Sequence, residues 1–278
     1  MKTAVLIQAH KNECYIKSLA ENNQGVRFYV HFDAKYPEKR NWLISQGLSN
    51  LKVIEDPVKV YWGGSSQVEA TIRLLKSAYK DERNFFFHLI SSECMVLKSF
   101  EDIEKEWMQY PDKQFIESHR DNKNEWRLRT RVPHSNTPFL RTFFGKCLNK
   151  CFKFKAFFYD SVSFGKENYY FGSQWFSVNR GFVHEVLDAY TTSGFFKKFH
   201  NITCADEHAF AIFSRTLYGK QENIVDCNNR YIKFSGKSSP DYIHKAMIEK
   251  LINQKKYWFA RKIQEDKLKK YISNGSTQ

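Results

Sequence analysis

The chain of 278 residues is long enough to bury a sizeable core, as one large domain or two small ones. Its 44 lysine and arginine residues against 30 acidic residues give a net charge of +14, which attracts nucleic acid, anionic membranes or nucleotide diphosphates. It has no run of about eighteen apolar residues and no signal-peptide pattern, so we expect a cytoplasmic protein without a membrane span.

The first part of the chain alternates short apolar runs with helical patterns. Strands are predicted at residues 4–9, 26–33, 51–54 and 84–90. One helical pattern passes through Ile16 and Leu19. A second begins at Ser65 or Ser66, either of which can cap it, and its apolar stripe is Val68, Ile72, Leu75 and Ala78. Buried parallel strands separated by helices predict a βαβ sheet, in which ligands bind beyond the carboxyl ends of the strands.

The residues that follow these strands are therefore candidate ligand contacts. They are His10, Asp33, the turn at residues 61–64 and the segment 91–94. An acid at a strand end suits the hydroxyls of a ribose, and Trp62 offers a flat face to a base or sugar. Gly63 and Gly64 allow a backbone to approach closely. A plain turn at the two glycines and a capping role for Asp33 explain the same residues equally well.

The segment from about 117 to 170 is basic and aromatic. Its densest part contains Phe143, Phe144, Lys146, Lys150, Phe152, Lys153, Phe154, Lys155, Phe157 and Phe158. A helix with aromatic and cationic faces suits an anionic membrane surface, and the composition also suits nucleic acid. A lid or core helix with a solvated basic face is the third interpretation.

The six cysteines indicate reduced thiols. Cys147 and Cys151 lie one helical turn apart, and His200 precedes Cys204 by four residues, but no CxxC or HxxxH pair completes a tetrahedral zinc set. We therefore predict buried or unreactive thiols and no metal.

The last hundred residues are predicted to be mainly helical. A helix from Arg180 carries an apolar stripe of Val183, Val186, Leu187 and Tyr190. Another begins near Ala205 and places Asp206 and Glu207 in its first turn, where the helix dipole also favours acids. From about Asp241 the chain is a basic helical segment. We find no repeat and no linker, so residues 1–278 are predicted to form a single domain.

Three groups of residues together indicate a sugar-nucleotide transferase. Residues 171–176 form an aromatic wall that can stack on a sugar, and the acids Asp206 and Glu207 offer a carboxylate that can take a proton from an attacking hydroxyl. The cations Arg261 and Lys262 can receive a departing diphosphate. Behind an α/β half, these groups in this order predict a glycosyltransferase.

Seven motifs extend this prediction over nearly the whole chain, from Val5 to about Ile263. They are LIQAHKN (6–12), YVHFD (29–33), WGGSSQVEAT (62–71), LISSECMVLKS (89–99), FGSQWFSVNR (171–180), ADEHAF (205–210) and FARK (259–262). With them the chain resembles the core-2/I-branching β-1,6-N-acetylglucosaminyltransferases and the peptide xylosyltransferases, in their short bacterial form. The resemblance implies a GT-A type α/β fold, with a mixed central sheet flanked by helices and a basic helical C-terminal segment. It makes residues 1–116 the nucleotide-binding half and 117–278 the acceptor and catalytic half.

The resemblance also implies an inverting, metal-independent transfer from a UDP-sugar to a hydroxyl, with N-acetylglucosamine as the expected sugar and a β-linkage as the product. The sequence contains no Asp-x-Asp, the usual metal-holding motif of GT-A enzymes, so neither a metal nor another cofactor is expected. Arg261 and Lys262 match the diphosphate-binding positions and Glu207 matches the catalytic base. A register shift of one residue would make Asp206 the base, and the two side chains point about 100° apart on a helix.

The remaining site residues are carried over in the same way. Asp33 matches the uridine contact, with His10 and Trp62 in the neighbouring turns. The sugar and acceptor contacts are expected at Ser173, Gln174, Trp175, Glu117, Arg127 and Arg129. One departure is clear: the family usually has an acid followed by an aromatic residue and proline where this chain has Cys94, Met95 and Val96.

The leading hypothesis is a bacterial β-glycosyltransferase of lipopolysaccharide or capsule synthesis. It would act on a lipid-linked acceptor at the inner face of the cytoplasmic membrane, where a basic surface contacts anionic lipid. The alternatives are a basic nucleic-acid-binding protein, for which the sequence has no recognised motif, and a degenerate glycan-binding relative, which only Cys94 supports. We therefore expect a UDP-sugar and a glycan as partners, and no nucleic acid.

Overall fold

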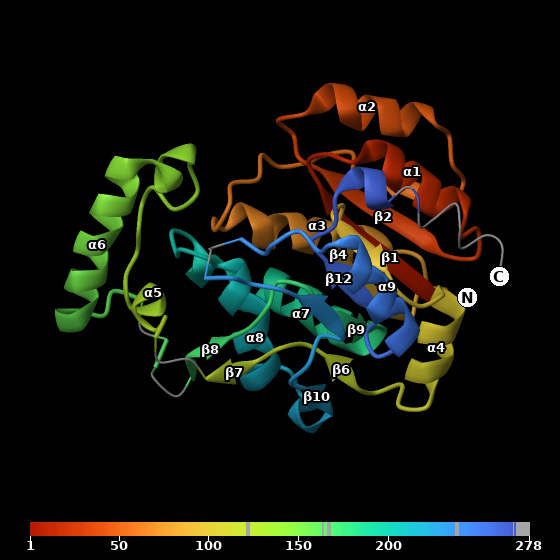
Figure 1. Cartoon of the computed structure of the whole chain (residues 1–278). Helices are drawn as coiled ribbons and strands as arrows, with labels where there is room; N and C mark the ends of the chain where they lie inside the picture. The colour runs from red at the N-terminus through yellow and green to blue at the C-terminus, as the bar shows by residue number, and fades with distance from the viewer. Residues whose placement is uncertain (121–122, 163, 166–167, 237–238, 269, 271–278) are drawn as a thin grey trace.

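A mixed sheet forms the centre of the computed structural model, which describes residues 1–120, 123–162, 164–165, 168–236, 239–268 and 270. Its strands are β1 (Thr3–Ala9), β2 (Arg27–Phe32), β3 (Leu51–Val53), β4 (Phe86–Ser91), β6 (Gln114–Phe115), β9 (Ser177–Asn179) and β10 (Ile224–Val225). Among the described residues they lie in the order β10-β6-β9-β4-β1-β2-β3 (Figure 1). The strands β4, β1, β2 and β3 run parallel to one another, whereas β9 runs antiparallel to both β4 and β6.

Helices and two smaller sheets surround this centre. The α-helices are α1 (Glu13–Glu21), α2 (Pro37–Ser45), α3 (Ser66–Tyr79), α4 (Phe100–Met108), α5 (Trp126–Arg129), α6 (Phe143–Phe158), α7 (Arg180–Thr192), α8 (Asp206–Thr216) and α9 (Lys245–Gln254). The short 3₁₀ helices are η1 (Pro138–Arg141), η3 (Phe195–Phe199) and η4 (Gln221–Asn223). The smaller sheets are β11 (Arg230–Ile232) with β12 (Phe259–Arg261) and β5 (Cys94–Val96), and β7 (His119–Arg120) with β8 (Tyr170–Phe171).

The central sheet has a hydrophobic core on each face, because successive side chains of a strand point to opposite sides. Leu6 of β1 packs in a core with α3, α7 and α8, whereas its neighbours Val5 and Ile7 pack in a core with α1, α4 and α9. A strand buried on both faces needs a continuous apolar run, and the sequence has one at residues 4–7. The predicted mixed sheet flanked by helices is confirmed.

The predicted serine cap of α3 is wrong. Ser65 has helical backbone angles (φ −61°, ψ −17°) instead of the extended ones a capping residue needs, and its side chain makes no capping hydrogen bond. Ser66 Oγ accepts a hydrogen bond from the Tyr61 amide at 2.9 Å. The Ser66 amide donates instead to Asn136 Oδ1 at 3.1 Å. A Cβ on Gly64 would lie 2.3 Å from the same Asn136 oxygen, so this turn needs glycine to let the two segments approach.

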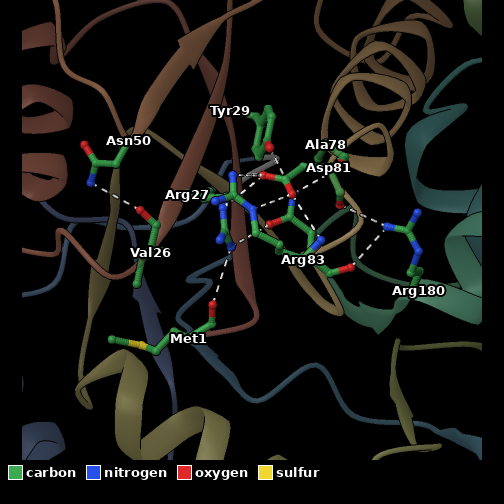
Figure 2. Close-up of polar contacts among 10 residues, drawn as sticks. Met1, Val26, Arg27, Tyr29, Asn50, Ala78, Asp81, Arg83 and Arg180 are labelled. Atoms are coloured by element: carbon green, nitrogen blue, oxygen red, sulfur yellow. Dashed lines mark hydrogen bonds and ion pairs between the residues drawn. The ribbon is translucent and has the colours of Figure 1, made fainter.

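A polar network fixes the loop that leads from α3 into β4. Figure 2 shows Arg27 of β2 beside Asp81, where Arg27 Nε lies 3.0 Å from Asp81 Oδ2. Arg180 donates to the carbonyl oxygens of Tyr79 (2.9 Å) and Asp81 (3.1 Å). The fully buried Asn84 donates to the Ala78 carbonyl at 2.8 Å and accepts from Arg27. These bonds anchor the amino end of β4, whose carboxyl end enters the site described below.

We predict that Asn84→Ala destabilises the protein by about 1–3 kcal/mol, because it leaves the buried Ala78 carbonyl without this donor. Urea unfolding measures the loss. The matched control is Asn22→Ala, since Asn22 also donates to a carbonyl, that of Ser18, but at an exposed position. An equal effect of the two substitutions would show that the buried network has no special role.

Candidate active site

A cleft of about 770 Å³ opens at the carboxyl ends of the parallel strands. His10 follows β1, Asp33 follows β2 and Glu93 follows β4, and all three line it. Because β2 and β4 lie on opposite sides of β1, this is the point where the strand order reverses and where α/β sheets bind ligands. The volume is in the range of small-molecule sites.

A second hollow, of about 510 Å³, lies beside α9. It is lined by Tyr231, Met247, Lys250, Leu251, Gln254, Lys256 and Tyr257. These residues include no carboxylate that could accept a proton, and none of them was predicted as a site residue. The cleft at the strand ends is therefore the candidate active site.

Ten of the twelve predicted site residues line this cleft. They are His10, Asp33, Trp62, Glu117, Ser173, Gln174, Trp175, Glu207, Arg261 and Lys262. Arg127 adjoins it, because its Nη1 lies 2.9 Å from Glu207 Oε2. Arg129 pairs instead with Glu125 at 3.7 Å and does not line the cleft, so its acceptor role stays a prediction without support from position.

The acids at the start of α8 lie in different environments. Asp206 is buried and its Oδ2 accepts a hydrogen bond from Gln67 Nε2 at 2.6 Å. Burial and the negative charge of Glu207 raise the pKa of Asp206 above its ordinary value. The Glu207 side chain is 32% exposed and pairs with Arg127. The helical offset thus gives the two carboxylates separate surroundings, as the sequence predicted.

A chain of amide side chains connects Asp206 to the sheet. Gln67 Nε2 also contacts Gln174 Oε1 at 2.9 Å, and Gln174 Nε2 donates to Gln8 Oε1 at 2.7 Å. Gln8 Nε2 then donates to Thr71 Oγ1 at 2.7 Å. This largely buried network links α8, α3 and β1 and fixes their relative positions, although Asp206 Oδ1 has no hydrogen-bond partner in it. Sequence reasoning missed Gln8 and Gln67, although both lie inside the conspicuous motifs LIQAHKN and WGGSSQVEAT.

The aromatic wall, residues 171–176, is held in place by contacts with Glu117 and Glu207. The Gly172 amide donates to the Glu207 carbonyl at 2.9 Å. A Cβ on Gly172 would lie 1.8 Å from the Glu117 carbonyl oxygen, so only glycine fits there. Glu117 Oε2 accepts from the Ser173 amide at 3.0 Å, and burial raises the pKa of Glu117. Glu117, Ser173 and Glu207 are thereby brought together on one side of the cleft.

The basic pair lies at the end of β12, opposite a buried carboxylate. Lys262 Nζ lies 3.2 Å from Glu93 Oε2, and Lys11 Nζ lies 2.6 Å from Glu93 Oε1. Arg261 donates to Ser91 Oγ and stands over the Trp175 ring, 4.8 Å from its centroid. Burial opposes the charge of Glu93, but the Lys11 hydrogen bond and the nearby cations outweigh it and lower the Glu93 pKa.

Glu93 lines the cleft and lies in the segment 91–94 that was expected to contact a ligand, but the sequence analysis gave it no role of its own. The signal was present, because residues 91–94 follow a predicted strand and Glu93 is the acid among them. Its neighbour Cys94, at the position where the resemblance leads us to expect an acid, is buried, and its thiol contacts Ser91 Oγ at 3.3 Å. This strand end therefore still contributes a carboxylate to the cleft, one residue away from the expected position.

The residues predicted to bind a nucleotide line the same cleft. Asp33 Oδ1 accepts from the amides of Lys35 (3.0 Å) and Val60 (3.3 Å), so Asp33 also closes the local turn. The Trp62 ring is 43% exposed, and the Arg141 guanidinium lies 5.3 Å from its centroid. Burial lowers the pKa of the neighbouring His31 to about 4, which keeps that imidazole neutral at physiological pH.

Among the described residues, no group of three or more His, Cys, Asp or Glu side chains is arranged to hold a metal ion. Metal independence stays a prediction. All six cysteines are free thiols; Cys94 and Cys204 are buried, and Cys147 and Cys151 are exposed.

Comparison with protein families places this chain in a known group. The family model described as "Core-2/I-Branching enzyme" matches residues 17–256. The chain belongs to the Core-2/I-Branching enzyme family. Comparison with curated proteins gives no significant match.

This Core-2/I-Branching enzyme is accordingly a glycosyltransferase, and family membership implies a nucleotide-sugar donor and a glycan acceptor. The family resemblance drawn from the seven motifs is confirmed. The mixed central sheet with helices on both faces is consistent with the GT-A-like glycosyltransferase fold of the family.

The raised pKa of Asp206 makes a prediction about stability. The folded enzyme holds a proton that the unfolded chain releases above about pH 4, so the free energy of unfolding falls as pH rises between the two pKa values. Asp206→Asn keeps an acceptor for Gln67 but cannot titrate. Urea unfolding at about pH 5 and about pH 8 should show a smaller loss for the variant than for the wild type. The exposed control Glu222→Gln should behave as wild type; identical slopes for Asp206→Asn and wild type would contradict the assignment.

Proposed function

We propose that the enzyme transfers a sugar, N-acetylglucosamine in the first instance, from a UDP-sugar to a hydroxyl of a glycan acceptor, with inversion and without a metal. The observation that carries this proposal is the placement of Glu207 and of the Arg261–Lys262 pair in one cleft. A base for the nucleophile and cations for the leaving group are the two charges that direct displacement requires.

Glu207 is proposed as the base. Its carboxylate takes the proton of the acceptor hydroxyl while that oxygen bonds to the anomeric carbon, and the bond to the diphosphate breaks with its electron pair leaving on UDP. Arg127, at 2.9 Å, orients the carboxylate. Attack from the side opposite UDP converts an α-linked donor into a β-linked product. Asp206 is less suited to this role, because it is buried and holds its hydrogen bond with Gln67.

Arg261 and Lys262 are proposed to receive the diphosphate. Fixed cations aimed at developing negative charge stabilise a leaving group by several kcal/mol, about as a bound metal would. Lys262 Nζ lies 3.2 Å from Glu93 Oε2. We therefore expect the diphosphate to replace Glu93 as the ionic partner of Lys262. The pairing with Glu93 holds Lys262 where the diphosphate would bind.

The rest of the cleft supports the placement of donor and acceptor. Asp33 and His10 line the cleft where β2 and β1 end, and Trp62 lines it from the turn before α3, which suits the uridine. Trp175 beside Arg261 offers a ring to the sugar. Glu117 and Ser173 lie on the Glu207 side, which suits the acceptor. The net charge of +14 favours an acidic or lipid-linked acceptor of a bacterial surface glycan, such as lipopolysaccharide or capsule, at the inner face of the membrane.

Glu207→Gln is expected to lower the turnover number about 10²–10⁴-fold while UDP binding stays intact, because the amide cannot accept the proton. UDP release from a panel of UDP-sugars, with an acceptor mixture and EDTA present, measures the effect. Asp206→Asn serves as the comparison, since it replaces the carboxyl of the neighbouring acid by an amide that cannot act as a base. Loss of activity in Asp206→Asn together with full activity in Glu207→Gln would reverse the assignment of the base.

Glu93→Gln is expected to tighten UDP binding and to lower the thermal stability of the free enzyme. The change leaves Lys11 and Lys262 close together without the buried carboxylate, at a cost of about 1–3 kcal/mol, and a bound diphosphate supplies the missing negative charge. Calorimetric titration with UDP and thermal unfolding test both effects. The control Glu13→Gln removes another Lys–Glu pair, with Lys39, that does not line the cleft. Weaker UDP binding by the Glu93 variant would overturn the proposed exchange.

A further inference from the structure

Helix α6 lies at the edge of the molecule, next to α5 and apart from the central sheet (Figure 1). Its buried residues are Gly145 and Ala156, and between them Asn149 Oδ1 lies 2.9 Å from His134 Nε2. Gly145, Asn149 and Ala156 share one side of the helix, since they are spaced by four, seven and eleven residues. The remaining sides of α6 face solvent.

The outward sides of α6 carry large apolar rings. Five phenylalanines of this helix are each between 67% and 77% exposed: Phe143, Phe144, Phe154, Phe157 and Phe158. Leu148 is a further exposed apolar side chain of α6, at 41%. Single exposed apolar residues are common, but a cluster of this kind on one helix marks an interaction surface.

The same helix carries only positive charge. Lys146, Lys150, Lys153 and Lys155 are exposed, and residues 143–158 contain neither Asp nor Glu. The first three lysines are spaced by four and three residues and so form a row along one flank of the rings. Lysines beside phenylalanines complement a surface that is negatively charged above an apolar layer, which is the structure of an anionic bilayer.

We propose that α6 docks on an anionic lipid bilayer, with its phenylalanine rings at the boundary of headgroups and acyl chains and its lysines on the lipid phosphates. No helix among the described residues is both long and apolar enough to cross a membrane, so α6 would lie on the surface. Nucleic acid fits less well. Single-stranded nucleic acid binds by stacking its bases on the faces of aromatic rings and on arginine side chains. In the pairs Phe143–Phe144 and Phe154–Phe158 the edge of one ring meets the face of the other, at 79° and 66°, and α6 has no arginine.

Docking through α6 would also fix the position of the cleft. The short helix η1 precedes α6 directly, and its residues Pro138 and Arg141 line the cleft. Arg141 in addition stands over Trp62. The cleft would therefore open close to the bilayer, which suits a lipid-linked acceptor; this last step rests on the proposed function, whereas the lipid binding itself does not.

The test is flotation of the purified full chain with vesicles of phosphatidylcholine, either alone or mixed with phosphatidylglycerol. We expect binding to the mixed vesicles that weakens with added salt, and little binding to the neutral ones. Lys146→Gln, Lys150→Gln and Lys153→Gln together should lower the partition coefficient about a hundredfold. Phe154→Ser with Phe158→Ser should lower it about tenfold or more.

Matched controls separate α6 from the net charge. Lys59→Gln, Lys220→Gln and Lys250→Gln together make the same change of charge at exposed positions elsewhere, and Tyr110→Ser removes an exposed ring that follows α4. These variants should bind as wild type. Equal losses in the control and α6 lysine variants, or no binding of the wild type to anionic vesicles, would overturn the proposal. So would binding of an RNA duplex that depends on α6 when vesicle binding does not.

The experiment is independent of catalysis, because it needs neither donor nor acceptor. Loss of UDP-sugar turnover in Glu207→Gln with unchanged flotation would support both proposals separately. Flotation that fails while turnover persists would overturn the docking proposal alone. Circular dichroism and thermal unfolding check that the α6 variants are folded, as expected for substitutions at exposed positions.

Discussion

The parallel pairing of β1 with β2 on one side and β4 on the other is the constraint on which the site depends. It aligns the carboxyl ends of three strands, so that His10, Asp33 and Glu93 meet at one edge although they are up to about eighty residues apart. The pairing is stable because β1 is apolar on both faces and each face has its own helical layer. A one-residue slip would bring polar Gln8 into a core position, so the packing that holds the sheet also fixes the cleft.

The second half of the chain completes the cleft through long-range contacts. Pairing of β12 with β5 brings Arg261 opposite Cys94 and therefore places Lys262 against Glu93. The backbone contacts of Gly172 hold the aromatic wall to Glu117 and Glu207. Each carboxylate that results has its own balance of burial and charge. Glu93 is kept ionised by cations, whereas the pKa values of Glu117 and Asp206 are raised by burial. Glu207, paired with Arg127, stays partly open to the cleft.

The sequence was sufficient for the features that depend on local pattern. The apolar runs located β1 to β4, the stripe of Val68 and Ile72 located α3, and the first-turn position of Asp206 and Glu207 implied their different directions. The predicted serine cap of α3 was wrong because the Ser66 amide donates to Asn136 Oδ1, which comes from a segment seventy residues away. The contacts of Glu93 with Lys11 and Lys262, and of Gln67 with Asp206, depend on tertiary packing that no local pattern encodes. The position of Arg129 outside the cleft lining likewise depends on tertiary packing.

Under the two proposals, the positive charge of the enzyme would act in two physically different ways. Inside the cleft, Lys262 is paired with Glu93. Only a ligand that brings a comparable negative charge into this low-dielectric site can replace the carboxylate as the partner of the lysine. On α6 the lysines are exposed on a helix without acids, so they act through solvent and weaken with salt. Buried charges select a ligand, and exposed charges favour a surface. Because η1 connects α6 to the cleft wall, an enzyme held at an anionic surface would present its selective site to acceptors anchored in that same surface.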